Sequence, residues 1–337
     1  MTTRNVALSI LDLAPVIEGG TPADSFRDTV DLAQHAEQWG YHRYWLTEHH
    51  NMQAVASAAT SVIIGHVAAH TDKIRVGSGG IMLANHAPLM IAEQFGTLES
   101  LYPGRIDLGL GRAPGTDQPA MRALRRGLHS TGEDFPEQLN ELRSYLNPAL
   151  NGAVPGVRAI PGEGLNIPIW LLGSSGFSAQ LAGQLGLPFA FASHFAPTHL
   201  LQALELYHRN FRPSKALDKP YVMVGVNVLV ADSDEEAKWL FTSQEQQFLN
   251  VLRGHSGGLK PPVDDMEKLW SEHEKEMVRG NMLGYSAIGS PDTVKQKMDL
   301  IIDQTRANEL ITTSQVYDHQ ARLRSYELLA KVMRIVG

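Results

Sequence analysis

The sequence predicts a single (β/α)₈ TIM barrel with an insertion after the seventh strand. Short apolar segments alternate with longer helical segments, which is typical of parallel strands joined by crossover helices. About eight such repeats follow one another, and a chain of 337 residues lies within the usual size of this fold. Because the two halves of the chain do not differ in composition, a closed barrel is favoured, and an open doubly wound sheet stays the structural alternative.

The strands are expected at the short apolar runs, and most of these runs are followed by a segment with the helical period. A set of eight parallel strands is the number that closes a barrel of this type. The expected strands cover residues 6–13, 41–47, 74–80, 105–110, 167–172, 188–192, 221–230 and 309–313.

Helix ends are marked by capping residues, proline and glycine. The first helix is expected to have Asp24 or Ser25 as its N-cap and to end before Gly40. Another begins at Pro88, because a proline ring fits the first turn of a helix. The other helices that the pattern predicts cover residues 175–186 and 291–304.

Two stretches do not fit a minimal barrel, although residues 1–337 are expected to form one domain. Residues 151–164 are rich in glycine and proline and are expected to form an irregular excursion or hairpin. Residues 233–285 hold charged helical segments and are interpreted as an insertion. Loops that follow barrel strands lie on the active face, so this insertion is a candidate cover for the site. A pair of solvated helices on the barrel flank is the alternative.

Composition excludes several classes of function. The formal net charge is -7, and the 29 lysines and arginines are scattered, so a nucleic-acid partner is not expected. The absence of cysteine excludes disulfides, thiolate nucleophiles and cysteine-based metal centres. No apolar run approaches the ~20 residues of a membrane span, and the N-terminus does not resemble a signal peptide. We therefore expect a soluble, cytoplasmic protein.

Residues with useful chemistry directly follow the expected strands. In a (β/α)₈ barrel the carboxyl ends of all strands converge on one rim, where active sites are built. Each motif is weak by itself, but five motifs on one rim predict an active site there. They comprise Glu48, His49 and His50 after the second strand, Gly79 and Gly80 at the end of the third, Arg112 after the fourth, Ser174 and Ser175 after the fifth, and Ser193 and His194 after the sixth.

The paired histidines do not predict a metal site. Adjacent residues at a strand end point in different directions, and no third ligand follows His49 and His50 at a zinc spacing. A histidine at the rim of a cavity is well placed to exchange protons near neutral pH. A structural histidine is the alternative for each.

Gly79 and Gly80 remove two β-carbons at the barrel mouth. This lets a flat ring approach the backbone, whereas a strand-terminal bend without a ligand is the alternative reading.

Arg112, Ser174 and Ser175 form a candidate site for a phosphomonoester. A guanidinium suits bidentate contact with phosphate, and hydroxyls at the start of a helix add donors and a positive dipole end. The alternatives are an ion pair of Arg112 with Glu48 or Asp117 and serines that only cap the helix.

Four segments of the chain resemble the luciferase-like flavin monooxygenase family, and the resemblance covers nearly the whole sequence. It implies a (β/α)₈ barrel, in agreement with the element count. Where light-emitting members carry a reactive cysteine, this chain has Gly111, so bioluminescence is not expected. Ser174 stands where those members have an acidic residue. The segments are residues 44–50, 75–83, 101–112 and 289–294.

The resemblance implies roles for the residues at the rim. Reduced FMN would lie across the barrel mouth, and His49 would line its cavity and assist catalysis. The bond between Gly79 and Gly80 matches a cis peptide beneath the flavin ring. The phosphate would lie near Arg112 and three serines. The cofactor-binding residues so implied are Gly79, Gly80, Arg112, Ser174, Ser175, Ser178, Ser193 and His194.

The resemblance also implies partners and leaves rival functions open. A small organic substrate would be oxidised with molecular oxygen. Reduced FMN would come from a separate NAD(P)H-dependent flavin reductase, because the chain has no dinucleotide-binding fingerprint. A homodimer that pairs through helices including residues 57–69 is expected. The alternatives are F420-dependent hydride transfer, a phosphosugar-type isomerase or metal hydrolase, and a non-catalytic flavin-binding subunit.

Overall fold

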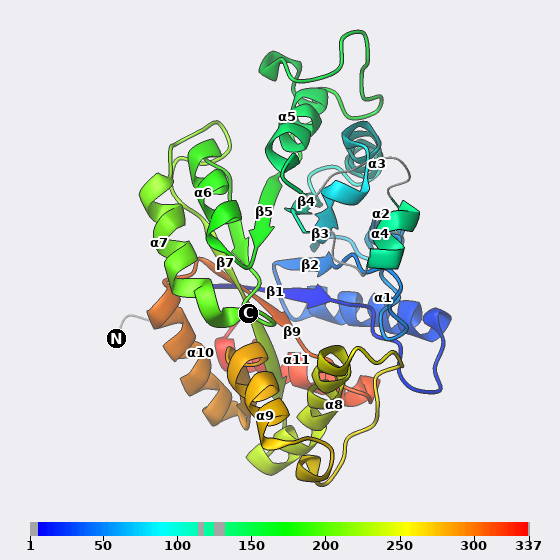
Figure 1. Cartoon of the computed structure of the whole chain (residues 1–337), viewed down its shortest axis with the longest axis vertical. Coiled ribbons are helices and arrows are strands. Elements are labelled where there is room, and N and C mark those ends of the chain that lie inside the picture. Colours follow the sequence, from blue (N-terminus) through cyan, green and yellow to red (C-terminus); the bar gives the residue numbers. More distant parts are fainter. Residues whose placement is uncertain (1–5, 114–117, 125–131, 336–337) are drawn as a thin grey trace.

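The computed structural model describes residues 6–113, 118–124 and 132–335, and it contains a closed barrel of eight parallel strands (Figure 1). β9 closes the barrel, since it pairs with both β1 and β7, and β6 pairs with β7. The predicted barrel is confirmed, and the open sheet is excluded. The barrel strands are β1 (Ala7–Asp12), β2 (Arg43–Leu46), β3 (Arg75–Met82), β4 (Ile106–Gly111), β5 (Ile169–Gly173), β6 (Phe189–Phe191), β7 (Val222–Val230) and β9 (Glu309–Thr313).

A ninth strand, β8 (Ser286–Gly289), lies outside this ring and pairs with the upper half of β7. Asn227 of β7 is in register with Thr313 of β9 and also with Ser286 of β8. β8 therefore pairs with the same edge of β7 as β6 does, but nearer the carboxyl end of β7. Sequence analysis missed this strand because four residues that follow a long insertion are too few to show a period.

Helices surround the barrel between successive strands (Figure 1). The helices predicted to begin near residues 88, 175 and 291 are all present. No helix in the described part of the chain is long and apolar enough to cross a membrane. The helices that follow the strands are α1 (Pro22–Gln38), α2 (Thr60–Ala69), α3 (Pro88–Leu101), α4 (Gln118–Leu124), α5 (Phe135–Leu146), α6 (Gly176–Leu185), α7 (Leu200–Asn210), α10 (Pro291–Thr305) and α11 (His319–Met333), with 3₁₀ turns η1 (Leu83–Asn85), η2 (Pro148–Leu150) and η3 (Pro197–His199).

The predicted N-cap of the first helix is wrong. Thr21 caps α1, and Asp24 occupies the third helical position, where its side chain completes a capping box. Pro22 occupies the first turn, which its fixed backbone angle suits, so the helix begins earlier than the side chains of Asp24 and Ser25 alone indicate.

The inside of the barrel is layered. At the amino ends of the strands, Arg43 is buried between the carboxylates of Asp107 and Glu309, at 2.6 Å and 3.1 Å. A buried apolar cluster that includes Leu11 and Trp45 follows toward the carboxyl ends. The Arg43 network at the bottom of the barrel is therefore separated from the mouth by an apolar layer.

Candidate active site

The insertion after β7 reaches across to the loop after β1. Leu259 donates a backbone hydrogen bond to Val16 and accepts one from Glu18, both at 2.8 Å. This loop follows the carboxyl end of β1, so the insertion contacts the active face and does not only lie on the flank. The insertion contains α8 (Asp234–Arg253), η4 (Met266–Lys268), α9 (Glu272–Lys275) and a π-helical turn, η5 (Glu276–Met282).

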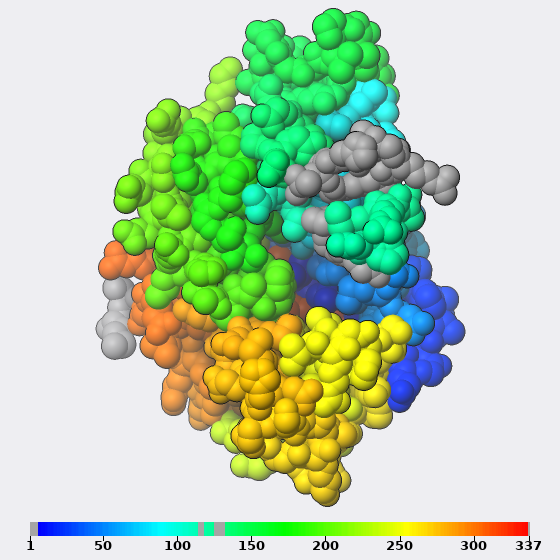
Figure 2. All heavy atoms as spheres, viewed as in Figure 1, coloured from blue at the N-terminus to red at the C-terminus, as the bar shows by residue number. Residues whose placement is uncertain are grey.

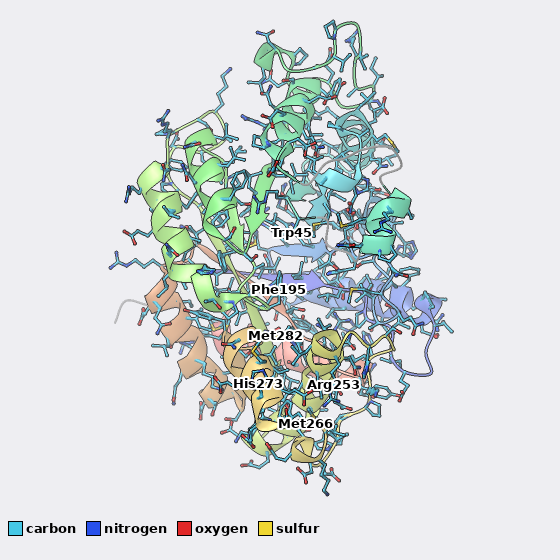
Figure 3. The ribbon with its side chains drawn as sticks, in the orientation of Figure 1. Trp45, Phe195, Arg253, Met266, His273 and Met282 are labelled. Carbon is cyan, nitrogen blue, oxygen red and sulfur yellow. The ribbon has the colours of Figure 1, made fainter. Side chains whose placement is uncertain are left out.

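One face of the molecule is hollowed between the barrel loops and the insertion. Figure 2 shows the hollow between green residues of the middle of the chain and the yellow to orange insertion, with blue N-terminal residues at its floor. In Figure 3, Trp45, Phe195 and Met282 follow one another from the barrel to the insertion. The β-carbon that Gly284 lacks would lie 3.5 Å from Pro197, so the loop after β6 contacts the end of η5. Two loops thus enclose the mouth.

His49 follows β2 and is only partly exposed. Its Nδ1 lies 3.0 Å from the Thr47 hydroxyl, which is itself 2.9 Å from the Ser57 hydroxyl. These contacts fix the ring and leave Nε2 without a hydrogen bond in the described part of the chain. Burial lowers the pKa of His49 to about 4 despite the nearby charge of Glu48, so the imidazole is neutral at neutral pH.

His50 has a structural partner. Its Nε2 lies 2.9 Å from Oε1 of Glu48, and the same oxygen contacts Nε2 of His86 at 2.9 Å. The other carboxylate oxygen of Glu48, Oε2, accepts from the backbone N–H of Met82. Burial by itself raises the pKa of Glu48. The hydrogen bonds from His86 and His50 and the charge of His86 outweigh burial, so the pKa of Glu48 lies below its usual value. Glu48 thereby joins the ends of β2 and β3. Sequence analysis missed His86, whose position after η1 gave no signal.

The described residues contain no group of three potential ligands arranged to hold a metal ion. The contacts of Glu48 with His50 and His86 are instead hydrogen-bonded pairs.

The Gly79–Gly80 peptide bond is cis, as the resemblance implied. A β-carbon on Gly79 would lie 2.5 Å from the side chain of Leu11, and one on Gly80 would lie 2.8 Å from the carbonyl oxygen of Gly109. The barrel's own packing therefore requires a glycine at position 80, where the neighbour is backbone, whereas at position 79 the neighbour is the end of a flexible side chain.

Arg112 and the start of α6 lie together. The guanidinium carbon of Arg112 is 4.4 Å from the ring centroid of Phe177, which is in the first turn of α6. Ser175 is the N-cap of this helix, but its side chain makes no capping hydrogen bond. A guanidinium and an unused hydroxyl thus meet at the positive end of a ten-residue helix, a combination that binds anions.

The other residues of the expected phosphate site differ in environment. Ser178 is buried against Gly173, whose missing β-carbon would lie 2.9 Å from the Ser178 hydroxyl. Ser174 has no side-chain hydrogen bond within the described ranges. Glu48 is bonded elsewhere, so it is not the partner of Arg112, and Asp117 lies outside the described residues.

Ser193 and His194 follow β6 on the opposite side of the barrel from β2. The Ser193 hydroxyl donates to the carbonyl of Gly225 at 2.6 Å, so it is already used. The ring of His194 lies where Gly225 has no side chain, since an added β-carbon would be 2.4 Å from Nδ1. Burial, together with the nearby charge of His49, lowers the pKa of His194 to about 4. Two neutral imidazoles therefore lie near each other at the mouth.

These two pKa values predict how stability depends on pH. An unfolded histidine binds a proton near pH 6.5, whereas His49 and His194 in the folded chain do so only near 4. The unfolded state is therefore favoured as the pH falls from about 6.5 toward 4. We expect each histidine to remove about 1–2 kcal/mol between about pH 7 and 5. Urea unfolding of the chain and of His194→Gln at both pH values measures this, and an equal pH dependence of the two contradicts it.

The fold and site define a (β/α)₈-barrel enzyme with its chemistry at the carboxyl ends of the strands. Residues 8–308 match the family described as luciferase-like monooxygenase. A luciferase-like monooxygenase of Escherichia coli (strain K12) is 53% identical over 332 residues, 98% of each chain. YvbT of Bacillus subtilis (strain 168) is 59% identical over 331 residues, also 98% of each chain. The chain belongs to the luciferase-like monooxygenase family.

Solved structures agree with this assignment. The crystal structure of apo-MsnO8 is 35% identical, has a TM-score of 0.86, and covers 98% of this chain and 99% of its own. The oxygenating constituent of 3,6-diketocamphane monooxygenase, solved with FMN, has a TM-score of 0.70 but 17% identity, over 97% of each chain. An F420-dependent secondary alcohol dehydrogenase has a TM-score of 0.66 at 14% identity, over 99% of this chain and all of its own. The last two show the fold alone.

Another relative has a more specific name. The N-acetyl-S-alkylcysteine monooxygenase of Bacillus subtilis (strain 168) is 43% identical over 189 residues, which are 56% of this chain and 57% of that protein.

Proposed function

We propose that the chain is the oxygenating component of a two-component flavin monooxygenase. It would bind reduced FMN supplied by a separate NAD(P)H-dependent reductase and use molecular oxygen to oxidise a small organic substrate. The observation that carries this proposal is the meeting of Arg112, Phe177 and Ser175 at the start of α6. Family membership favours an oxidoreductase over the isomerase and hydrolase alternatives.

The residues at the mouth fit a flavin phosphate and ring. Arg112 and the start of α6 would bind the phosphate, and the flat Gly79–Gly80 backbone would support the ring. When bound, reduced FMN supplies the electrons that activate oxygen. His49, neutral and free at Nε2, would hold or move a proton near the substrate. The loop after β6 and the insertion would exclude water from the mouth.

The name of one relative indicates which class of substrate to test first. Because a relative is named an N-acetyl-S-alkylcysteine monooxygenase, small thioethers are the first substrates to test.

Arg112 tests the phosphate site. Arg112→Ala is expected to weaken FMN binding by roughly one to two orders of magnitude, because a charge-assisted contact contributes about 1.5–3 kcal/mol. Riboflavin has the same ring but no phosphate, so its affinity should change little. Arg112→Lys should recover only part of the loss, since an ammonium lacks the two-pronged geometry. Fluorescence titration measures all three, and equal weakening of FMN and riboflavin would require withdrawing the phosphate assignment.

We also propose a homodimer that pairs through α2 and α3. Val62, Met90 and Leu101 on these helices have 70%, 53% and 63% of their surfaces exposed. Exposed apolar residues that lie on neighbouring helices are typical of an interface. Light scattering should give a dimer mass at micromolar concentration, and Val62→Glu should shift it toward the monomer. A monomer for the unaltered chain rejects this proposal.

A further inference from the structure

Four glycines leave a strip of backbone without side chains on the inner face of β3 and β4. Residues two apart on a strand share a face, so Gly109 and Gly111 face inward with Asp107, which belongs to the network at the bottom of the barrel. The leucines that alternate with these residues belong to the core cluster that contains the surrounding helices. The glycine strip consists of Gly79, Gly80, Gly109 and Gly111.

The side chain of Met82 borders this glycine strip at the barrel mouth. Met82 of β3 is in register with Gly111 of β4, and a β-carbon on Gly111 would lie 2.7 Å from the Met82 sulfur. The sulfur therefore lies on the inner face, over Gly111, and Met82 is partly exposed. Met223, another methionine inside the barrel, is fully buried in the apolar layer below. Met82 thus presents a thioether to the mouth.

Met82 lies between the two groups to which we assign functions. Its backbone N–H donates to Glu48 at 3.0 Å, and His49 directly follows Glu48. On its other side the sulfur covers Gly111, which directly precedes Arg112. A flavin with its phosphate at Arg112 and its reacting atoms near His49 would therefore lie over the glycine strip and beside Met82.

A buried chain of amides fastens the insertion to the barrel mouth. Asn227 of β7 donates to the carbonyl of His194 at 2.6 Å and accepts from Nε2 of Gln244, on α8, at 2.6 Å. The carbonyl oxygen of Gln244 accepts from the backbone N–H of Gln315 at 3.4 Å. α8 is thus held against the carboxyl ends of β6, β7 and β9.

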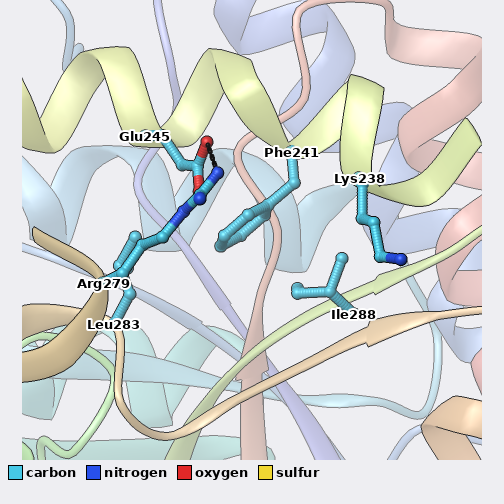
Figure 4. A pocket seen from close by; sticks show the side chains of 6 residues that line it. All are labelled: Lys238, Phe241, Glu245, Arg279, Leu283 and Ile288. Atoms are coloured by element: carbon cyan, nitrogen blue, oxygen red, sulfur yellow. Dashed lines mark hydrogen bonds and ion pairs between the residues drawn. The ribbon is translucent and has the colours of Figure 1, made fainter. Parts of the chain in front are cut away.

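An ion pair fixes η5 to α8. Glu245 of α8 is buried and pairs with Arg279 of η5 at 2.6 Å (Figure 4). The pair lies beside a pocket of about 300 Å³, whose other lining residues are Lys238, Phe241, Leu283 and Ile288. Because both α8 and η5 are held in place, the insertion encloses its side of the mouth. A reactive molecule formed there stays near Met82 for longer than it would in open solution.

We propose that the enzyme oxidises its own Met82 to the sulfoxide when reduced flavin and oxygen react without an organic substrate. The inference rests on the proposed function, since the oxidant would form at the flavin. Two electrons from reduced FMN and two protons convert oxygen into hydrogen peroxide. The Met82 sulfur then takes one oxygen atom: an S–O bond forms, the O–O bond breaks, and the other oxygen leaves as water. The sulfur is oxidised by two electrons and the peroxide is reduced.

Oxidation of Met82 would change the mouth reversibly. A sulfoxide is polar, whereas the sulfur of Met82 lies over Gly111 and above an apolar layer. A polar oxygen at this place would weaken the binding of a flat ring to the glycine strip. Methionine sulfoxide reductases restore the thioether. The modification would therefore reduce wasteful oxygen consumption while substrate is scarce.

Met333 provides an internal reference for this modification. It is partly exposed, like Met82, but it is the last residue of α11. The carbonyl oxygen of Ile335 would be 2.6 Å from a β-carbon on Gly40, which precedes β2. Met333 therefore lies near the amino ends of the strands, at the opposite end of the barrel from the mouth.

Peptide mass spectrometry of the full chain in two reactions tests the proposal. The first contains an excess of the chain over reduced FMN, with oxygen and catalase but no organic substrate, so that catalase destroys any peroxide that escapes into solution. The second contains the chain and added hydrogen peroxide, without flavin or catalase. We expect the ratio of Met82 sulfoxide to Met333 sulfoxide to be at least about tenfold higher in the first, because groups held together react as if concentrated. Equal ratios overturn the inference.

Two leucine variants provide the matched comparison, since leucine has a similar apolar volume but no sulfur. After the first reaction, the unaltered chain and Met333→Leu should bind FMN about 3- to 10-fold more weakly than before it. Met82→Leu should keep its own starting affinity. If Met82→Leu loses as much affinity as the unaltered chain, the oxidation that matters lies elsewhere and the role of Met82 is refuted.

Titration of the untreated chain with reduced FMN separates this inference from the proposed function. Saturable binding of FMN together with equal sulfoxide ratios refutes the inference alone. Absence of FMN binding refutes the proposed function, and the inference with it.

Discussion

Replacing His49 with alanine is expected to lower the rate of substrate oxidation by ~10²- to 10⁴-fold, the contribution of a positioned acid or base. The affinity for FMN should change far less, because the phosphate contacts lie after β4 and β5. The free Nε2 and the low pKa of His49 support this role: the ring is neutral at pH 7 and its orientation is fixed through Thr47.

Oxygen uptake with substrate, compared with FMN titration of the same variant, separates the two effects. His50→Ala is the control, since His50 contacts Glu48 and is not expected to touch the reacting atoms. A His49→Ala protein that turns over at the original rate shows that the residue is structural. A loss of folding stability large enough to account for the lost activity also contradicts the catalytic role.

Replacing Arg43 with methionine is expected to destabilise the fold by about 3–5 kcal/mol, because it leaves the buried carboxylates of Asp107 and Glu309 without their shared cation. Arg75 still contacts Asp107, but among the described residues Glu309 keeps only hydroxyl partners, Ser9 and Tyr221. The site at the mouth should be unaffected in the folded fraction, since an apolar layer separates it from this network.

Urea unfolding near neutral pH measures the change. Arg324→Met is the matched control: its partners Asp232 and Glu327 are on the surface, and such pairs contribute about 0–1 kcal/mol. Equal destabilisation by the two substitutions would show that the buried network does not hold the bottom of the barrel together.

The sequence was sufficient to predict the barrel because its strands are apolar runs separated by amphipathic helices. It was insufficient where a structural element depends on contacts distant in the chain. β8 has only four residues and is defined by pairing with β7. The position of the insertion depends on a backbone pairing between Leu259 and the loop after β1, which no local pattern encodes.

The candidate site shows the same division. His49 and Arg112 were predicted because each follows a strand whose end must lie on the rim. Asn227 and Gln244 were not, because a buried amide chain is recognisable only when β7 and α8 are placed together. Ser193 was predicted to bind the cofactor, but its hydroxyl donates to Gly225, a contact that sequence spacing does not indicate.

The most direct test of the account is anaerobic titration of the full chain with reduced FMN and, separately, with reduced F420. Binding can be followed by the fluorescence of Trp45 and Trp170, which lie inside the barrel. The account predicts saturable binding of reduced FMN, at least about tenfold tighter than F420, followed by oxygen consumption when air and a thioether substrate are added. Tighter binding of F420, or no binding of reduced FMN, contradicts it.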